Sequence, residues 1–334
     1  MFGASHIHGE ESLIQEFLAP LAAGYPGAFG LTDDCAAFTP TAGCDLVVKT
    51  DPVAADIHFF PDDAPEDIGW KALAVNVSDL AAKAATPRAY LMALSFPEAP
   101  NRDWMQRFAA GLSQAQQAFG MHLIGGDTDR RPGPVTISIT VFGEVPAGRM
   151  VRRGTAKAGD LICVSGTLGD AALGLRLRQS QSLAHTLDLE PQHASYLTTR
   201  YLRPRPATGL CFALRQHARA AMDLSDGLAK DLGRMCRASS VGAEVEAAAI
   251  PVSPGAKRAF TADAALFPLC ISAGDDYEVL CAIAPAEFSA FQRKAATAGC
   301  PITRIGTFVA NDGVSIRGAD GGTLDLPKLG WDHF

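Results

Sequence analysis

The sequence lacks the cysteine pairs that mark zinc-binding and dithiol redox proteins. It has eight cysteines among 334 residues, but no C-x-x-C pair occurs, and this disfavours both classes. Three of the cysteines, Cys163, Cys211 and Cys281, lie in apolar runs. We therefore expect buried thiols in a reducing compartment.

Long apolar runs and an excess of positive charge are also missing. No uninterrupted apolar stretch is long enough to span a bilayer, and the N-terminal MFGASHIHGEE has no basic segment followed by an apolar one, as a signal peptide does. The formal net charge is -7 and there is no basic stripe, which argues against a nucleic-acid partner. We expect a cytoplasmic protein that binds neither membranes nor nucleic acids.

The common nucleotide-binding motifs are absent as well. There is no G-x-x-x-x-G-K-[ST], no G-x-G-x-x-G between a strand and a helix, and no kinase H-R-D set. The glycine turn at 166–169 is only a weak phosphate-binding signal. No Ser-His-Asp or Cys-His arrangement can be identified, so a nucleotide site would have to be built by other means.

The length allows two domains with a large core. Strand and helix patterns alternate in both halves, which predicts an α/β or α+β class. The stretch 145–160 carries proline, glycine and basic residues without periodicity and marks a boundary. We place an N-terminal domain at 1–148 and a C-terminal domain at 149–334.

The expected elements follow from the spacing of apolar residues and from the residues that typically start and end helices and strands. The segment 65–85 is a predicted helix, because proline and acids begin it and Thr-Pro ends it. The alternating segment 135–145 is the clearest strand. The segment 121–127 should be a short strand running into a glycine turn, and 180–206 should be irregular. Further helices are expected at 12–19, 101–120, 170–179, 206–217, 226–238 and 287–299, and further strands at 44–51, 89–97, 160–166, 277–285 and 303–309.

What the chain does have is a series of aspartates in similar contexts. Each lies at the end of an apolar run or beside glycine or serine, as in MDLSDGLAKDL (222–232) and VNVSDLAAKAA (75–85). Gathered carboxylates repel by about 4 kcal/mol per close pair at an effective dielectric of about 20, so such a cluster persists only with cations. Oxygen ligands with few histidines favour Mg²⁺, which usually also binds substrate phosphates. The acidic series is Asp33, Asp34, Asp51, Asp79, Asp127, Asp223, Asp226, Asp275 and Asp276.

Taken singly, most of these residues also have an ordinary structural explanation. Asp79 is compatible with a solvated helix face, Asp226 with a helix cap, and Asp127 with a turn after two glycines. Asp223 is harder to explain, because it ends an apolar run three residues before that cap. His58 is equally compatible with a substrate contact and with a hydrogen-bonded histidine at a strand end.

The motifs, taken in order, resemble the thiamine-monophosphate kinase family. That family belongs to the superfamily that includes aminoimidazole ribonucleotide synthetase and selenophosphate synthetase. The resemblance covers nearly the whole chain, and it is carried by TDDCAAF, KTDPVAADIHF, WKALAVNVSDLAAKAATPRA, LIGGDTDR, VRRGTAKAGD, VSGTLGDAALGL, YLRPRPATGL, MDLSDGL, SAGDDYEVL and GWDHF.

The resemblance implies a fold and a reaction. The fold is an N-terminal α+β domain, which binds ATP and Mg²⁺ and whose sheet pairs across a homodimer, and a C-terminal α/β domain that completes the active site. The reaction is Mg²⁺-dependent, direct transfer of the γ-phosphoryl group of ATP to thiamine monophosphate, giving thiamine diphosphate and ADP. No protein nucleophile or base is required, because a phosphate oxygen of the acceptor is already ionised.

The resemblance also implies the roles of individual residues. Arg153 would add a fixed positive group to the phosphates, and Trp331 would stack on the thiazolium or pyrimidine ring. The implied Mg²⁺ ligands are Asp34, Thr50, Asp51, Asp79, Asp127 and Asp223, with Asp226 as a further metal-linked acid. The implied nucleotide contacts are Gly126, Asp127, Arg153 and Ser225, and the implied substrate contacts are His58, Asp275 and Trp331.

Three positions depart from the family pattern. Thr32 stands where a glycine is usual, Lys49 replaces a serine or threonine, and Asp275 replaces a longer glutamate. If this position supplies only its backbone carbonyl to a metal ion, a lysine is tolerated there. An inward-pointing Lys49 side chain would instead replace the charge of one metal ion. Two other functions remain open at this point: another ATP-using reaction of the same superfamily, and a nucleotide-binding regulator without turnover.

Overall fold

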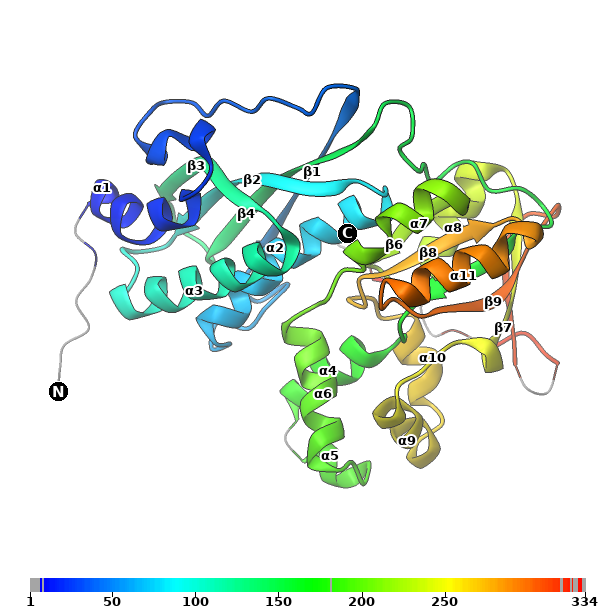
Figure 1. Cartoon of the computed structure of the whole chain (residues 1–334). Coiled ribbons are helices and arrows are strands. Elements are labelled where there is room, and N and C mark those ends of the chain that lie inside the picture. Colours follow the sequence, from blue (N-terminus) through cyan, green and yellow to red (C-terminus); the bar gives the residue numbers. More distant parts are fainter. Residues whose placement is uncertain are drawn as a thin grey trace. The chain divides into compact units, whose positions relative to one another are not determined.

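The computed structural model describes residues 7, 9–180, 182–318, 321–324, 326 and 330–331. The chain divides into two compact units (Figure 1). Of the C-terminal motif GWDHF, the last three residues lie outside the described residues. Unit 1 comprises Met1–Leu80 and Ala85–Gly148, and unit 2 comprises Ala81–Ala84 and Arg149–Phe334.

Unit 1 is built on a four-stranded sheet in the order β1-β4-β2-β3. Strands β2 and β3 are parallel and the other pairs are antiparallel. Pro52 is tolerated within β1 because β1 lies at the sheet edge. The strands are β1 (Cys44–Ala54), β2 (Thr86–Phe96), β3 (His122–Arg130) and β4 (Thr136–Pro146).

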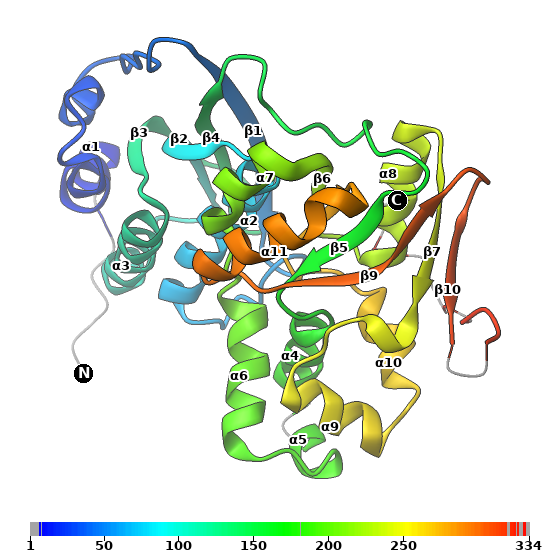
Figure 2. The same cartoon turned by 45° about the vertical axis from the view of Figure 1, so that its right-hand side comes forward.

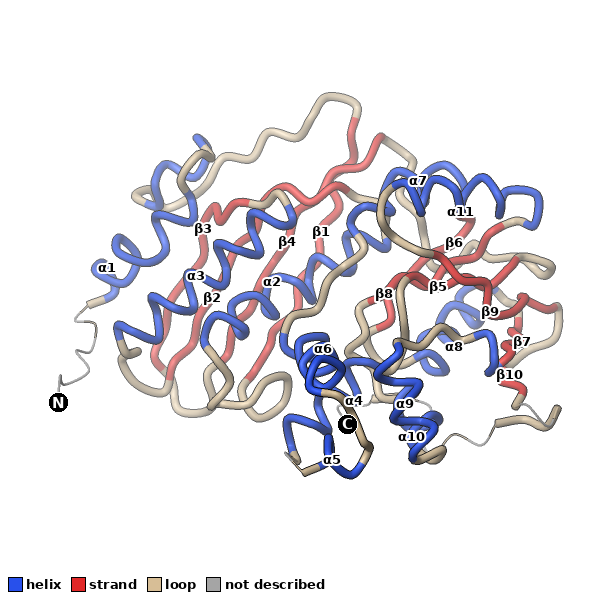
Figure 3. Tube along the Cα trace, turned by 60° about the horizontal axis from the view of Figure 1, so that its bottom comes forward, coloured by secondary structure: helices blue, strands red, loops and turns tan. Residues whose placement is uncertain are grey.

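Two long helices of unit 1 run along its sheet, α2 (Pro65–Ala82) and α3 (Arg102–Phe119) (Figure 3). The side chain of Asn101 caps α3 by accepting the N–H of Asp103 at 2.8 Å, and left-handed Gly120 ends it. The helices pack closely, since a Cβ on Gly111 would lie 2.0 Å from the Glu66 carbonyl oxygen. The other helical segments of unit 1 precede β1: α1 (Glu10–Leu13), η1 (Ile14–Leu18), η2 (Ala19–Ala22) and η3 (Pro26–Leu31).

The period of two along each strand separates the residues of β1 into two sets. Asp51 pairs with buried Ile139, on the face that carries α2. Thr50 pairs with Thr140, on the opposite face. Thr50 and Asp51, although adjacent in the sequence, therefore point to opposite faces of this sheet.

Unit 2 contains a six-stranded sheet in the order β10-β7-β9-β5-β8-β6. Only β10 and β7 pair in parallel; the other neighbours are antiparallel. The predicted mixed class of helices and strands is confirmed in both units. The strands are β5 (Leu161–Ser165), β6 (Ala218–Leu224), β7 (Gly242–Glu246), β8 (Glu278–Ile283), β9 (Ile302–Val309) and β10 (Val314–Arg317).

Helices cover both faces of this second sheet. One apolar cluster joins the sheet to α8, and another joins it to α7 and α11. In Figure 2, α11 lies in front of β5 and β9. No described helix is long and apolar enough to cross a membrane. The helical segments are α4 (Asp170–Gln179), α5 (Leu183–Thr186), α6 (Pro191–Leu202), η4 (Thr208–Leu210), α7 (Cys211–His217), α8 (Leu228–Ser239), η5 (Ala247–Ala249), α9 (Pro254–Ala262), α10 (Leu266–Ile271), η6 (Pro285–Glu287) and α11 (Phe288–Thr297).

Two local predictions were wrong. The stretch 180–206, expected to be irregular, contains α5 and α6. Tertiary packing holds α6 against α4, because a Cβ on Gly174 would lie 2.1 Å from the Leu197 carbonyl oxygen. The expected glycine turn after 121–124 is instead a continuous strand, since β3 runs through Gly125 and Gly126 to Arg130.

Candidate active site

Unit 1 contains a cavity of about 720 Å³ whose lining is partly acidic. Asp34, Gly126 and Asp127, three of the predicted site residues, all line it. Its apolar wall comes from the N-terminal segment and from the sheet face that carries Thr140. The apolar lining includes Ile14, Leu18, Leu31, Phe38, Leu91, Leu123, Ile124 and Phe142, and the acidic lining is Glu10, Asp33, Asp34 and Asp127.

The backbone at Gly126 explains why a glycine precedes the acid there. A Cβ at this position would lie 1.8 Å from the Met92 carbonyl oxygen of the paired strand, so no larger residue fits without moving β2 or β3. Asp127 follows on β3 and is exposed, with Oδ1 accepting the N–H of Thr128 at 2.9 Å. Its carboxylate is therefore fixed by a strand rather than by the turn that the glycines predicted.

A second group of predicted residues gathers where β1 meets α2. The Lys49 Nζ lies 2.9 Å from Oδ2 of Asp51 and 2.9 Å from Oδ2 of Asp79. Burial acts to lower the pKa of Lys49, but Asp79 and Asp51 together raise it above its usual value, so the ammonium stays charged. The N–H of Asp51 donates to the side-chain oxygen of buried Asn76 at 2.9 Å, which fixes the strand to the helix.

Thr50 lies on the cavity side of the sheet. Its hydroxyl donates to the Ile139 carbonyl at 3.2 Å and accepts from the Thr140 hydroxyl at 3.0 Å. Asp51 and Gly126 occupy the same row across the sheet, on β1 and β3. Three strand spacings of about 4.8 Å separate them by about 14 Å, so one ion cannot directly bridge Asp51 and Asp127.

The loop that carries Asp223, Ser225 and Asp226 in unit 2 is organised by Asp231. Fully buried Asp231 lies on α8, and its Oδ2 accepts the N–H groups of Ser225 at 3.1 Å and Asp226 at 2.9 Å. Arg234 binds Asp231 at 2.8 Å and Asp226 at 2.6 Å. Burial raises the pKa of Asp231. These contacts fix the shape of the loop. Asp226, the predicted metal-linked acid, forms an ion pair with Arg234.

Two predicted substrate contacts adjoin this loop. The N–H of Asp275 donates to the Ser225 carbonyl at 2.9 Å, and the Asp275 side chain accepts the Tyr277 hydroxyl at 3.1 Å. The N–H of Trp331 donates to the Asp226 carbonyl at 2.9 Å, while the Trp331 carbonyl accepts from Lys230. The indole side chain is 48% exposed. The structure thus brings five predicted residues of unit 2 together: Asp223, Ser225, Asp226, Asp275 and Trp331.

Two other predicted segments form hydrogen bonds outside these groups. The Arg152 carbonyl accepts the N–H of Ala221, which places the neighbouring Arg153 backbone about four strand residues, or about 13 Å, from Ser225. In unit 1, the Nδ1 of His58 accepts the N–H of Ala54 at 3.1 Å, just after the end of β1. This is the hydrogen-bonded strand-end histidine that the sequence left as one of two alternatives.

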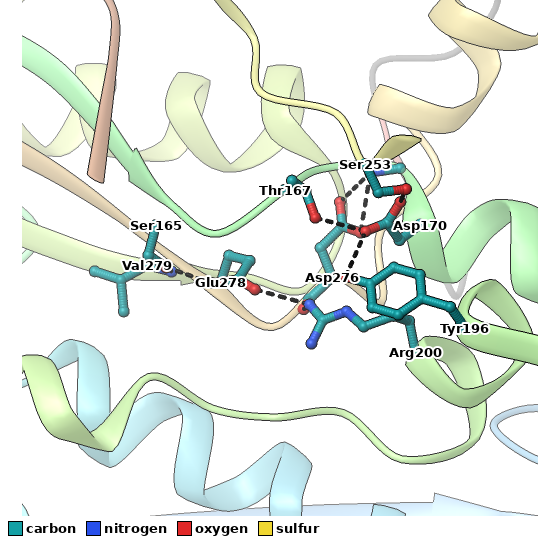
Figure 4. A network of polar contacts seen from close by, with 10 residues as sticks. Ser165, Thr167, Asp170, Tyr196, Arg200, Ser253, Asp276, Glu278 and Val279 are labelled. Carbon is teal, nitrogen blue, oxygen red and sulfur yellow. Dashed lines mark hydrogen bonds and ion pairs between the residues drawn. The ribbon is translucent and has the colours of Figure 1, made fainter. Parts of the chain in front are cut away.

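A buried polar network supports the loop that contains Asp276 (Figure 4). Both oxygens of Asp276 accept the N–H of Gly169, at 3.0 and 2.9 Å, which fixes the start of α4. Arg200 donates to Glu278 at 2.7 Å and to the Asp276 carbonyl at 3.2 Å. Asp170 accepts the hydroxyl of Ser253 at 2.6 Å. The glycine turn at 166–169 thus has a structural role in unit 2, because Gly169 binds Asp276, the residue after Asp275.

Two carboxyl groups of this network are predicted to make the stability of unit 2 depend on pH. Burial raises the pKa of Asp276 well above 3.8, and burial also raises the pKa of Glu278. Between its unfolded and folded pKa values, such a group binds a proton only in the folded state. Its contribution to the free energy of unfolding therefore falls as pH rises, by at most about 1.4 kcal/mol per pH unit.

We expect Asp276→Asn to remove part of this pH dependence, because asparagine resembles the neutral acid and keeps an oxygen for Gly169. The measurement is urea unfolding of both proteins from about pH 4 to about pH 8. The free energy of unfolding of the wild type, minus that of the variant, should fall as the pH rises from about 4 to about 8. Exposed Asp312→Asn is the control, and a wild-type minus Asp276→Asn difference that stays constant with pH contradicts the prediction.

The donor chemistry of the predicted residues suits Mg²⁺, because all are oxygen donors. In the part of the chain that the structure describes, no group of three or more His, Cys, Asp or Glu side chains is arranged to hold a metal ion. At the cavity, Asp34 and Asp127 line the same space with carboxylates, the ligand type that Mg²⁺ prefers. Between Asp51 and Asp79, the ammonium of Lys49 occupies the central position, so the fit there is incomplete.

Sequence reasoning missed several residues that position this chemistry. Asp231 stands within the quoted motif MDLSDGLAKDL, so its place in the first turns of a helix was a usable signal. Asn76 is fully buried on α2, and nothing in its local sequence distinguishes it from a solvated polar residue of that helix. Arg200 and Glu278 form a buried ion pair between segments 78 residues apart, and no local pattern predicts such a pair.

The units match two family models of a single superfamily. The model for AIR synthase related protein, N-terminal domain, matches residues 32–145, and the model for the C-terminal domain matches 157–319. Together with the two sheets and the acidic cavity, these matches define the class of the chain as a two-domain AIR synthase related protein.

Curated and solved relatives narrow this class. Thiamine-monophosphate kinase from Caulobacter vibrioides is 38% identical and covers 96% of this chain and 89% of the relative, and that from Salmonella typhimurium is 39% identical and covers 91% of each. The crystal structure of thiamine-monophosphate kinase from Stenotrophomonas maltophilia has a TM-score of 0.84 at 37% identity, covering 96% of this chain and 100% of the other. AaThiL complexed with AMPPCP and TMP has a TM-score of 0.76 at 30% identity, covering 98% and 97%. The chain belongs to the thiamine-monophosphate kinase family.

Proposed function

We propose that this protein transfers the γ-phosphoryl group of ATP to thiamine monophosphate, giving thiamine diphosphate and ADP. The observation that carries the proposal is the cavity of unit 1, which joins an apolar wall to Asp34, Gly126 and Asp127. A nucleotide base fits the apolar wall, and its phosphates, carried with Mg²⁺, fit the acidic region. Membership of the family supports the same reaction.

The proposed Mg²⁺ ions supply charge neutralisation for two phosphate compounds that would otherwise repel each other. Asp34, Thr50 and Asp127 would hold ions on the cavity side of the sheet, and the outward-facing oxygens of Asp51 and Asp79 on its other side. In unit 2, Asp223 and Asp226 are the proposed metal-linked acids. Because Asp51 and Asp127 are about 14 Å apart, we propose more than one ion.

The chain's own residues would then orient the reactants. The backbone at Gly126 leaves room for a phosphate beside β3, and Arg153 and Ser225 are the proposed further nucleotide contacts. Asp275, held by Ser225 and Tyr277, is proposed to contact thiamine monophosphate, together with Trp331. His58 is the weakest member of the proposed substrate set, because its Nδ1 is engaged by its own strand.

The proposed stacking role of Trp331 predicts a selective effect of Trp331→Ala. We expect KM for thiamine monophosphate to rise about 5-fold or more, since loss of a ring contact with a cationic ligand costs about 1 kcal/mol or more. KM for ATP should change little. Steady-state kinetics with each substrate varied separately checks this, and an equal rise of both KM values contradicts the stacking role.

Further parts of the proposal concern assembly and location. We propose that residues 1–148 form the nucleotide-binding and dimerisation domain and that residues 149–334 complete the catalytic residue set. A homodimer formed by the sheet of unit 1 is supported by β1, where Leu46 and Val48 are 39% and 54% exposed. A cytoplasmic location is supported by the eight cysteines, which are all thiols. Light scattering of the purified protein tests the dimer.

The experiment that tests the function is an assay of thiamine diphosphate formation by purified protein, with ATP and thiamine monophosphate, with and without Mg²⁺. We expect product only when Mg²⁺ is present. ATP turnover with another acceptor alone would support a different reaction of the superfamily. Binding of both compounds without product would support a regulator.

A further inference from the structure

Lys49 forms an ion pair with both of the acids that unit 1 presents between β1 and α2. Its Nζ lies 2.9 Å from Oδ2 of Asp51 and 2.9 Å from Oδ2 of Asp79. The lysine side chain is 32% exposed, and the two aspartate side chains are 46% and 20% exposed. A single cation thus lies between two carboxylates from different elements, which is the arrangement expected around a bound metal ion.

The surrounding structure fixes both carboxylates. The N–H of Asp51 donates to Asn76, and the Asn76 amide donates back to the Asp51 carbonyl at 3.4 Å and to the Ala72 carbonyl at 3.1 Å. Asp79 lies three residues after Asn76, on the same side of α2. Lys49 is two residues before Asp51 on β1 and therefore faces the same helix. The ammonium reaches the centre of a site that its own strand and the facing helix already hold in place.

We propose that the Lys49 ammonium is a built-in cation that takes the place of one divalent metal ion between Asp51 and Asp79. The inference deepens the proposed function and rests on it, since it states how many exchangeable ions the active site needs. The ammonium engages Oδ2 of each aspartate, which leaves Oδ1 of each to bind an exchangeable ion on the α2 side of the sheet. The lysine carries one charge instead of two, cannot be removed by chelators, and fixes the carboxylates before the nucleotide binds.

Removal of the lysine charge should therefore create a divalent-cation site. The test is a titration of nucleotide-free protein with Mn²⁺, followed by the electron paramagnetic resonance signal of unbound Mn²⁺. We expect Lys49→Met to bind one more Mn²⁺ than the wild type, with an affinity at that position about 100-fold higher or more, because a positive charge within about 4 Å no longer opposes it. Adding Asp79→Asn to Lys49→Met should remove the new site.

The control is Lys157→Met, which removes an exposed lysine elsewhere in the chain and should bind Mn²⁺ as the wild type does. An equal number of sites in the wild type and in Lys49→Met overturns the proposal. If Lys49→Met does not fold, wild-type crystals soaked in Mn²⁺ decide the question. The proposal predicts no anomalous scattering peak between Asp51 and Asp79, and a peak there, with Lys49 displaced, overturns it.

These measurements do not require turnover. Failure of the proposed function, seen as no thiamine diphosphate in the product assay, is therefore distinguishable from failure of the lysine proposal, seen in the Mn²⁺ count.

Discussion

Asp51→Asn is expected to lower kcat/KM for thiamine diphosphate formation by about 100-fold or more. Loss of a residue that only supports a metal ligand costs about 10- to 100-fold, and Asp51 is proposed to face the ion directly while holding Lys49. The fold should survive, because asparagine has the same shape and the backbone of Asp51 remains bonded to Asn76. Steady-state kinetics and a thermal melt of the variant check both parts.

Asp56→Asn is the matched control for this prediction. Asp56 is an exposed acid five residues further along the same motif, and its φ of 66° suits asparagine as well as aspartate. It should keep near-normal activity. Near-normal turnover of Asp51→Asn would remove Asp51 from the proposed site.

Gly126→Ala is expected to destabilise unit 1 by about 3 kcal/mol, as overpacking of a well-packed site does. The added methyl would lie 1.8 Å from the Met92 carbonyl oxygen, which belongs to the backbone of the paired strand and cannot rotate away. The strands must separate there, and the cavity edge that carries Asp127 must move with them. We therefore also expect a large loss of affinity for a non-hydrolysable ATP analogue, measured by calorimetry beside a denaturant titration.

The neighbouring glycine provides the control. A Cβ at Gly125 would meet only the end of the Leu91 side chain, at 3.2 Å, and that side chain is able to move by the small amount required. Gly125→Ala should therefore cost much less stability than Gly126→Ala. Equal effects of the two substitutions would contradict the steric explanation.

The parts of the fold that the sequence predicted are those with local signals. Helix α3 has an Asn101 cap and a Gly120 stop, and both appear in the sequence. Helix α6 has no side-chain cap, and it packs against α4 through the close approach of Gly174 to Leu197. Because such a contact forms between two helices, the sequence of either helix alone does not predict it.

For the candidate site, the local sequence likewise predicted the acidic residues but not their partners. Each aspartate was identified from its neighbours in the sequence. The structure places Asp34 and Asp127 in the lining of one cavity and Asp275 beside the loop that carries Asp226. The partners of these acids were harder to predict. Lys49 was identified as a departure from the family, but its bridge between Asp51 and Asp79 depends on the pairing of β1 with α2. The Arg200–Glu278 pair depends on contacts between distant segments.

The most direct test of the proposed reaction follows the transferred phosphoryl group itself. Purified protein is incubated with Mg²⁺, thiamine monophosphate and ATP labelled in its γ-phosphate, and the products are separated. We expect the label in the terminal phosphate of thiamine diphosphate, with one labelled phosphate for each ADP formed. Label found only in inorganic phosphate, or in a different acceptor, would contradict the proposed reaction.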